Sequence, residues 1–204
     1  CRRRKLMGTP FREIEKYQNR LKGSVIEVGS ERFGGSTCFL ADFCHRNNLK
    51  FYSVDFEIVA HQRAKLIPNT IAVQMKAEDF LKNIFPKDER ICFAYLDGFD
   101  YIFDEIKDTK AVIGQIDTYK QYGLELNNEN SKKSHLEIAR LLLDFVADKC
   151  FVMFDDTWGV NGAFEGKGGY AVPFLLENGF KVIEQNVTAK PWNCYIIVCN
   201  SNGI

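Results

Sequence analysis

Short apolar runs rich in β-branched and aromatic residues alternate with stretches of helical periodicity along most of this chain. The runs expected to form strands lie at 24–28, 50–54, 71–74, 91–96, 150–154, 180–185 and 195–199. Such alternation predicts a parallel sheet with helices on both faces. Only about nine residues separate the last two runs, too few for a crossover helix, so the final strand is expected to be antiparallel. We therefore predict a doubly wound, Rossmann-like α/β fold with a mostly parallel seven-stranded sheet.

The size and composition of the chain are those of one soluble globular domain spanning residues 1–204. Of its 204 residues, 46% are hydrophobic and 26% are charged, and the formal net charge is zero. The only basic run, at 2–5, is expected to be a solvated tail rather than a nucleic-acid-binding arm. No apolar run reaches the ~18 residues that a membrane span needs. We therefore expect neither nucleic acid nor membrane as a partner.

The seven cysteines form no Cys-x-x-Cys pair and lie mostly in apolar runs. This usage favours buried free thiols in a reducing compartment over disulfides or zinc ligands, so a cytoplasmic location is expected. The chain begins with Cys rather than Met, which leaves open that it is a piece of a longer polypeptide.

Four of the expected strands end in glycine or aspartate. Gly29 follows the first strand, Asp55 the second, Asp97 the fourth, and Asp155 with Asp156 the fifth. In open parallel sheets, ligands bind beyond the carboxyl ends of the strands, near the point where the strand order reverses. This regular placement predicts a ligand site at that edge of the sheet.

The loop after the first strand runs from Gly29 to Thr37 and contains the glycine pair Gly34 and Gly35. Glycines let a ligand approach the backbone closely, and the N–H groups of the following helix can receive a carboxylate or a phosphate. Glu27 is unusual, because a carboxylate in a buried strand is costly without a partner. Its partner is expected to be either a ligand ammonium or a nearby Arg or Lys.

Asp55 stands where an acidic side chain can accept hydrogen bonds from both hydroxyls of a ribose. The alternative is a helix-capping aspartate ahead of residues 56–60, and Glu57 is a second candidate for the ribose. The first loop and this acid together indicate a cofactor that contains a nucleoside.

Five segments follow one another along the chain: VIEVGSERFGGST, FYSVDFE, AEDF, FAYLDGFD and FVMFDDTW. In this order and spacing they resemble the successive motifs of class I methyltransferases that use S-adenosylmethionine (SAM). The later stretch GGYAVPFLLENGFKVI resembles the small-molecule O-methyltransferase branch, including the macrocin-type sugar methyltransferases. The resemblance covers residues 23–200 and is weakest over 101–133.

The resemblance implies a role for each part of the predicted site. The two ends of methionine would contact Glu27 and the first loop, and the ribose would contact Asp55. Ala77, Glu78 and Asp79 would border the adenine. Asp97 would lie beside the methionine and the acceptor. The residues expected to bind SAM are Glu27, Gly29, Ser30, Gly34, Gly35, Ser36, Asp55, Glu57, Ala77, Glu78, Asp79 and Asp97.

Asp97, Asp155 and Asp156 follow adjacent strands, and three carboxylates at that edge can hold Mg²⁺, which favours oxygen ligands. The resemblance implies such a trio, because several members of the branch use a metal there to orient and activate a hydroxyl. The alternative is that Asp156 caps the following turn and only Asp155 faces the site.

The same branch often carries a histidine, as general base, three residues past the aspartate of the fourth strand. This sequence has Asp100 there, and the ordinary pKa of an aspartate, near ~4, makes it a weaker base than histidine unless burial raises it. His135 is the other candidate, and its role in substrate contact or deprotonation is weighed against a structural one in a helix that Ser134 would cap. The expected catalytic residues are therefore Asp97, Asp100 and His135.

Two further segments are assigned from local pattern. Residues 1–22 are expected to contain an N-terminal helix that starts at Thr9-Pro10. The polar, Asn-rich stretch 98–133 has only patchy periodicity, and long irregular segments in compact domains are typically lids or substrate-binding regions. We therefore expect 98–133 to be a lid or a substrate-binding segment.

Taken together, these features predict SAM-dependent methyl transfer to an oxygen of a sugar or another hydroxylated small molecule. A non-catalytic methyltransferase-like module of a larger polypeptide and an NAD-dependent oxidoreductase are the alternatives. The oxidoreductase is disfavoured because the first loop lacks the Gly-x-Gly-x-x-Gly spacing and the chain has no Tyr-x-x-x-Lys pair. A homo-oligomer and a fusion to another enzyme domain both stay open.

Overall fold

The computed structural model describes residues 10–31, 35–187 and 194–200. Its central element is a seven-stranded sheet with strand order β3-β2-β1-β4-β5-β9-β8. The strands are β1 (Ser24–Val28), β2 (Lys50–Asp55), β3 (Ile71–Gln74), β4 (Ile91–Leu96), β5 (Val146–Asp155), β8 (Phe180–Asn186) and β9 (Tyr195–Asn200). β1 to β5 pair in parallel, and β9 lies antiparallel between β5 and β8. The predicted fold is confirmed, with the antiparallel strand in the predicted place.

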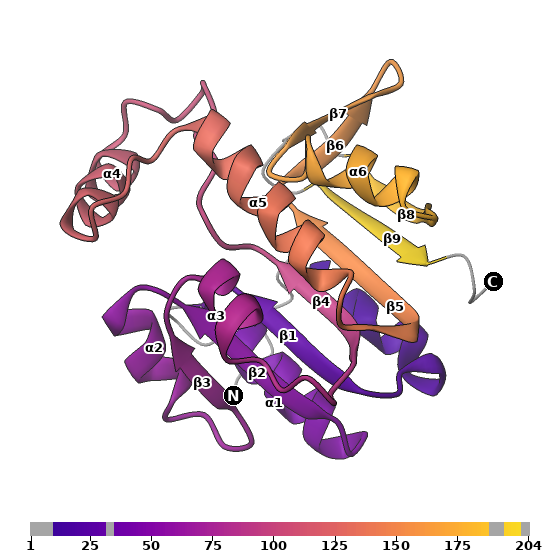
Figure 1. Ribbon diagram of the computed structural model, residues 1–204. Coiled ribbons are helices and arrows are strands. Elements are labelled where there is room, and N and C mark those ends of the chain that lie inside the picture. Colours follow the sequence, from indigo (N-terminus) through magenta and orange to yellow (C-terminus); the bar gives the residue numbers. More distant parts are fainter. Residues whose placement is uncertain (1–9, 32–34, 188–193, 201–204) are drawn as a thin grey trace.

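Helices cover both faces of the sheet (Figure 1). One face packs against α3 (Ala77–Asn83), α5 (Asn128–Leu142) and α6 (Ala171–Glu177). The other face packs against the 3₁₀ helix η1 (Pro10–Arg20) and α1 (Ser36–Arg46). α2 (Ile58–Ala64) contacts β2 and β3, and α4 (Lys110–Gln121) projects away from the sheet. The predicted start of the N-terminal helix at Thr9 lies outside the described residues.

The central strands divide the core into two clusters, because successive side chains of a strand point to opposite faces. In β5, Cys150, Val152 and Phe154 belong to the cluster under α3, α5 and α6. Phe151 and Met153 belong to the cluster under η1 and α1. Since both faces are buried, this strand reads in the sequence as a continuous apolar run rather than an alternating one.

The structure corrects the expectation of an irregular segment over 98–133. α4 lies within it, and α5 begins at Asn128 rather than after Ser134. Asn127 caps α5, because its Oδ1 accepts a hydrogen bond from a first-turn N–H at 2.7 Å. The side chain of Asn128 makes two hydrogen bonds with the backbone of Ile102, at 2.7 and 2.9 Å. Asparagine side chains thus supply the order that the weak periodicity of this stretch does not indicate.

A two-stranded hairpin follows β5 and was not predicted. It consists of β6 (Thr157–Val160) and β7 (Ala163–Gly166). Asn161 and Gly162 form its turn with φ angles of 51° and 83°, the left-handed pair that a type I′ turn requires. The hairpin returns the chain to the carboxyl end of β5.

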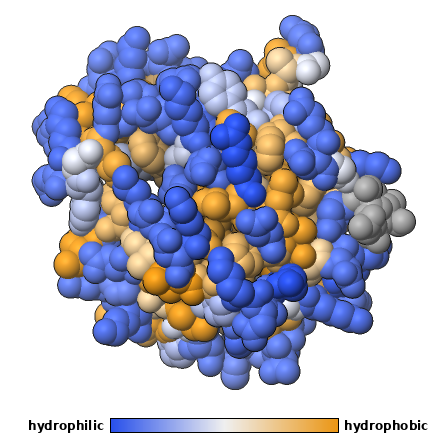
Figure 2. All heavy atoms as spheres, in the orientation of Figure 1, coloured by the Kyte–Doolittle hydropathy of each residue, from blue (hydrophilic) through white to orange (hydrophobic). Residues whose placement is uncertain are grey.

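Polar residues cover most of the face of the molecule shown in Figure 2, with apolar side chains visible toward its middle. Within the ranges described, no helix is long and apolar enough to span a membrane. Five of the described cysteines, Cys44, Cys92, Cys150, Cys194 and Cys199, are buried, as predicted, whereas Cys38 is exposed.

Candidate functional site

A cavity of about 260 Å³ opens at the carboxyl ends of β1, β2 and β4. This is the point where the strand order reverses, since β2 and β4 lie on opposite sides of β1. Of the residues expected at the site, Gly29, Ser30, Asp55, Glu57, Ala77, Glu78, Asp97 and Asp100 line the cavity. The structure therefore brings together residues that lie far apart in the sequence.

Other expected site residues do not line this cavity in the part of the chain that the structure describes. These are Glu27, Gly35, Ser36, Asp79, His135, Asp155 and Asp156. Gly34 lies outside the described residues. Asp79 is exposed on the first turn of α3, so its expected contact with adenine is not supported.

Glu27 is fully buried in β1, and three hydroxyl groups bind its carboxylate. Ser36 Oγ donates to Oε1 at 2.6 Å, and Thr37 Oγ1 and Ser53 Oγ donate to Oε2 at 2.8 and 2.6 Å. These hydroxyls take the place of the Arg or Lys considered from the sequence. Ser36 and Thr37 are the first two residues of α1, and Ser53 lies in β2. Glu27 therefore holds the start of α1 against β1 and β2 and supports the first loop from the sheet.

The same hydroxyls also hold the first loop. Thr37 Oγ1 accepts a hydrogen bond from the N–H of Glu31 at 3.0 Å. Ser30 Oγ lies 2.7 Å from Ser53 Oγ, and the N–H of Ser30 donates to Asp55 Oδ2 at 2.8 Å. Hydrogen bonds therefore hold both the start of the loop, at Ser30 and Glu31, and its end, at Thr37.

Burial raises the pKa of Glu27 from 4.5 to about 7, although its hydrogen bonds to Ser36, Ser53 and Thr37 oppose this shift. Between pH 4.5 and pH 7, Glu27 keeps its proton in the folded protein but has lost it in the unfolded chain. The free energy of unfolding therefore falls as the pH rises toward 7. Glu27→Gln removes this group, and we expect wild type to lose about 2.5 kcal/mol relative to the variant between pH 5 and pH 8. Urea unfolding of both proteins at the two pH values measures the difference.

Glu137→Gln, which replaces an exposed carboxylate on α5, is the matched control and is expected to keep the wild-type pH dependence. A wild-type protein that gains stability relative to Glu27→Gln over this pH range would contradict the prediction.

Asp55 ties the loops after β1 and β2 together and lines the cavity. Its Oδ2 accepts the N–H of Ser30, and its Oδ1 accepts the N–H of Glu57 at 2.7 Å. A carboxylate oxygen can accept more than one hydrogen bond, so this bonding is compatible with the recognition of a ligand hydroxyl. Asp55 thus bonds to the backbone of Glu57, just before α2, and also faces the cavity, so its position is compatible with both alternatives.

One part of the cavity wall is formed by α3 and α5. Glu78 is held there by Ser134 Oγ, which donates to Glu78 Oε1 at 2.6 Å. Three apolar side chains, Met75, Leu124 and Ile138, line the same cavity. Apolar walls with a few fixed polar groups are typical of sites for small molecules and cofactors.

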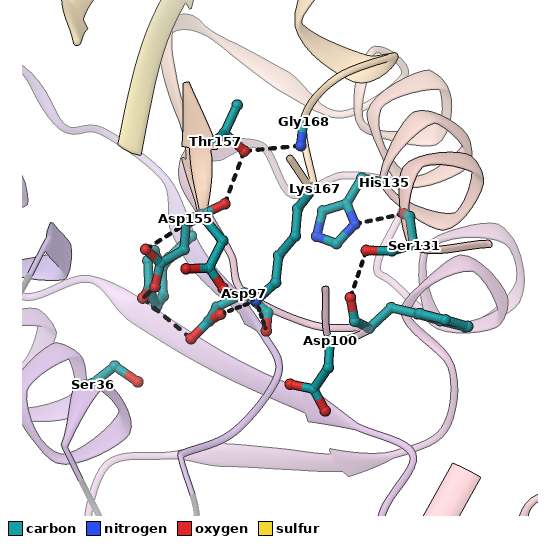
Figure 3. A network of polar contacts seen from close by, with 12 residues as sticks. Ser36, Asp97, Asp100, Ser131, His135, Asp155, Thr157, Lys167 and Gly168 are labelled. Carbon is teal, nitrogen blue, oxygen red and sulfur yellow. Dashed lines mark hydrogen bonds and ion pairs between the residues drawn. The ribbon is translucent and has the colours of Figure 1, made fainter. Parts of the chain in front are cut away.

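Two of the three carboxylates proposed as metal ligands, those of Asp97 and Asp156, contact an ammonium supplied by the chain itself. Lys167 is buried, and its Nζ lies 2.5 Å from Asp97 Oδ1 and 3.0 Å from Asp156 Oδ2. Tyr95 Oη donates to Asp155 Oδ2 at 2.6 Å. Figure 3 shows the Lys167 side chain extending past His135 to end at Asp97. In the described residues, no group of three His, Cys, Asp or Glu side chains is arranged to hold a metal.

The charges in this cluster influence one another strongly. Burial raises the pKa of Asp155 well above its ordinary value, and the neighbouring carboxylates of Asp97 and Asp156 raise it further. Burial alone would lower the pKa of Lys167, but the surrounding carboxylates, Asp156 first, hold it well above its ordinary value. The carboxylates therefore favour the protonated, positively charged form of Lys167.

Comparisons with known proteins agree with this topology. No family model and no curated protein sequence matches the chain. A putative rRNA methylase from Clostridium thermocellum has a similar structure, with a TM-score of 0.55 and 12% identity over 96% of this chain and 98% of that one. For a putative caffeoyl-CoA O-methyltransferase from Staphylococcus aureus, the TM-score is 0.54 at 8% identity, over 93% of this chain and 80% of that one.

A third similar structure is magnesium protoporphyrin IX methyltransferase from Synechocystis PCC 6803 with bound S-adenosylhomocysteine (SAH). Its TM-score is 0.51 at 10% identity, and the match covers 94% of this chain and 80% of that one. The fold is that of SAM-dependent methyltransferases. The three proteins are named for three chemically different acceptors, so this methyltransferase fold does not by itself select an acceptor.

The methyltransferase fold places the two candidate bases differently. Asp100 lines the cavity, and its N–H donates to Tyr119 Oη at 2.7 Å. His135 is fully buried within α5, where its Nδ1 donates to the carbonyl oxygen of Ser131 at 2.9 Å. Burial and the nearby Lys167 ammonium lower the pKa of His135 to about 3. Its position does not support the catalytic role considered from the sequence, nor is it in a first helical turn.

Lys167 and the hairpin that carries it were missed from the sequence. The hairpin has a readable signal, because Asn-Gly between apolar runs is the strongest short-range indicator of a two-residue turn. Nothing in the sequence around Lys167, which lies between glycines, indicates that it reaches Asp97. That contact depends on the pairing of β6 with β7.

Proposed function

We propose that this chain binds SAM in the cavity and transfers its methyl group to an oxygen of a small hydroxylated acceptor, such as a sugar. One observation carries the proposal: Gly29, Asp55, Glu78 and Asp97 line a single cavity at the switch point of a methyltransferase fold.

The lining residues fit the three parts of SAM. Asp55, with Glu57 beside it, is suited to the ribose hydroxyls, because its carboxylate is already oriented by two backbone N–H groups. Ala77 and Glu78 would border the adenine. The loop that begins at Gly29 would hold the methionine end, since the N-terminus of α1 offers N–H groups to a carboxylate.

When bound, SAM supplies an electrophilic methyl group on a sulfonium sulfur. The chain has to align an acceptor with that group, accept its proton and exclude water. Asp100 is the proposed proton acceptor because it is the candidate base that lines the cavity. Tyr119 of α4 packs against Phe56 and Phe99, with ring centroids 5.2 and 4.9 Å apart, so the 98–133 segment is the proposed cover.

Mg²⁺ is not part of this proposal. The residues present do not fit a metal, since the Lys167 ammonium contacts the same oxygens of Asp97 and Asp156 that a divalent ion would need.

A binding module without catalysis is the second candidate. It is favoured by the carboxylate of Asp100 at the place of the branch's usual histidine and by the burial of His135 away from the cavity.

Calorimetric titration with SAH and, separately, with NAD⁺ tests the cofactor, and transfer of labelled methyl from SAM to a panel of sugars tests the reaction. Binding of SAH together with labelled product supports methyl transfer. Binding of SAH with no product from any sugar or other hydroxylated acceptor supports the binding module. Binding of NAD⁺ in preference to SAH would refute the proposal.

A further inference from the structure

Lys167 is a buried cation, because its side chain is only 2% exposed. Placing an ammonium in the interior is costly unless charged and hydrogen-bonding partners compensate it. The arrangement around Lys167 supplies such partners, and nothing in the proposed alignment of SAM uses this residue directly.

All three N–H bonds of the ammonium have an oxygen within reach. Nζ lies 2.5 Å from Asp97 Oδ1, 3.0 Å from Asp156 Oδ2 and 3.3 Å from the carbonyl oxygen of Asp97. A lysine ammonium has three donors and no acceptor, so this set of oxygens satisfies it completely.

The backbone around Lys167 is built to bring it to this position. Its N–H donates to the carbonyl oxygen of Asp156 at 3.1 Å. On the other side, the N–H of Gly168 donates to Thr157 Oγ1 at 2.8 Å, and that hydroxyl donates to the carbonyl oxygen of Asp155 at 2.8 Å. The end of the hairpin is thus clamped onto the end of β5, and Figure 3 shows Lys167 pointing from this clamp toward Asp97.

A divalent metal would require the same oxygens. Mg²⁺ and Mn²⁺ sites are built from carboxylate oxygens at short distances, and here Asp97 Oδ1 and Asp156 Oδ2 already contact an ammonium. A metal at this place would lie against the positive charge of Lys167. Occupation by the ammonium and occupation by a metal are therefore mutually exclusive.

We propose that Lys167 is the resident cation of the Asp97–Asp155–Asp156 cluster, so that the site binds no divalent metal while Lys167 is present. Lys167 is a positioning residue: it is buried, does not line the cavity and acts by holding Asp97, which does. This inference concerns the cation alone and stands whether or not the cavity binds SAM.

Titration with Mn²⁺, followed by electron paramagnetic resonance, tests the inference on four folded proteins. These are wild type, Lys167→Ala, the double variant Lys167→Ala/Asp156→Asn, and Lys132→Ala. Lys132→Ala is the matched control, because it removes a neighbouring lysine that pairs with Glu165 of the hairpin at 2.7 Å rather than with the cluster. We expect saturable uptake of one Mn²⁺ per chain by Lys167→Ala alone.

Two results would overturn the inference. One is saturable Mn²⁺ binding by wild type that is lost in the double variant, which would show that a metal displaces the ammonium. The other is a folded Lys167→Ala that takes up no Mn²⁺. If Lys167→Ala does not fold alone, Mn²⁺ is expected to restore its cooperative thermal unfolding but not that of the double variant, and failure of that rescue overturns the inference equally.

Discussion

Replacing Asp55 with alanine is expected to weaken the binding of SAH by about 100-fold or more. Hydrogen bonds to a charged group contribute about 1.5–3 kcal/mol each, and a ribose offers two hydroxyls to this carboxylate. The substitution also removes the acceptor of two backbone N–H groups, those of Ser30 and Glu57, so the loops that would surround the ribose lose their common anchor. Calorimetric titration with SAH measures the effect.

Asp79→Ala is the control for this experiment. Asp79 is an acidic residue of α3 that directly follows the cavity residue Glu78. It is exposed and does not line the cavity, so the variant should bind SAH as wild type does. A folded Asp55→Ala protein with wild-type affinity would remove the ribose assignment. Equal losses in both variants would show that negative charge, rather than the position of Asp55, determines affinity.

Replacing Gly166 with alanine is expected to destabilise the protein by about 3 kcal/mol or more. Gly166 has a φ of +82°, and a Cβ built there would lie 1.9 Å from the carbonyl oxygen of Asp156. That carbonyl also accepts the N–H of Lys167, so the backbone cannot yield without disturbing the clamp that positions the ammonium. Urea unfolding at neutral pH measures the loss.

Gly162→Ala separates backbone strain from overlap. Gly162 lies in the turn of the same hairpin with a φ of +83°, but nothing lies within 4 Å of a Cβ built there. This variant should lose only the ~1–2 kcal/mol that a left-handed residue costs. Similar losses in the two variants would mean that the contact between Gly166 and Asp156 is unimportant for stability.

The sheet could be predicted because its strands are buried on both faces and are bounded by residues that end strands. The run at 150–154 is apolar throughout, and Asp155 marks its end. The α5 boundary could not be predicted as well, since Ser134 and Asn127 are both good capping residues. The choice between them depends on the bonds of Asn128 to Ile102, which join segments that are distant in sequence.

The site residues that directly follow a strand could be predicted from the sequence. Contacts between side chains of several elements were harder to predict. Gly29, Asp55 and Asp97 follow directly from strand ends, and all three line the cavity. The partners of Glu27 lie on β2 and α1, and hydroxyls leave no charge pattern in a sequence. The three aspartates do not reveal in the sequence whether they bind a metal or a lysine. The answer depends on the β6–β7 hairpin, which brings Lys167 back to Asp97 and Asp156.

The insertion of β9 between β5 and β8 also bears on how the protein folds during synthesis. Both neighbours of β9 precede it in the chain, so the sheet cannot close until Tyr195–Asn200 has left the ribosome. Until then β5 and β8 each expose a row of unpaired backbone groups, which is the form of a nascent chain most open to aggregation. β1 to β4, which carry the cavity, pair with one another and are all synthesised before β5. This half of the sheet can therefore assemble first.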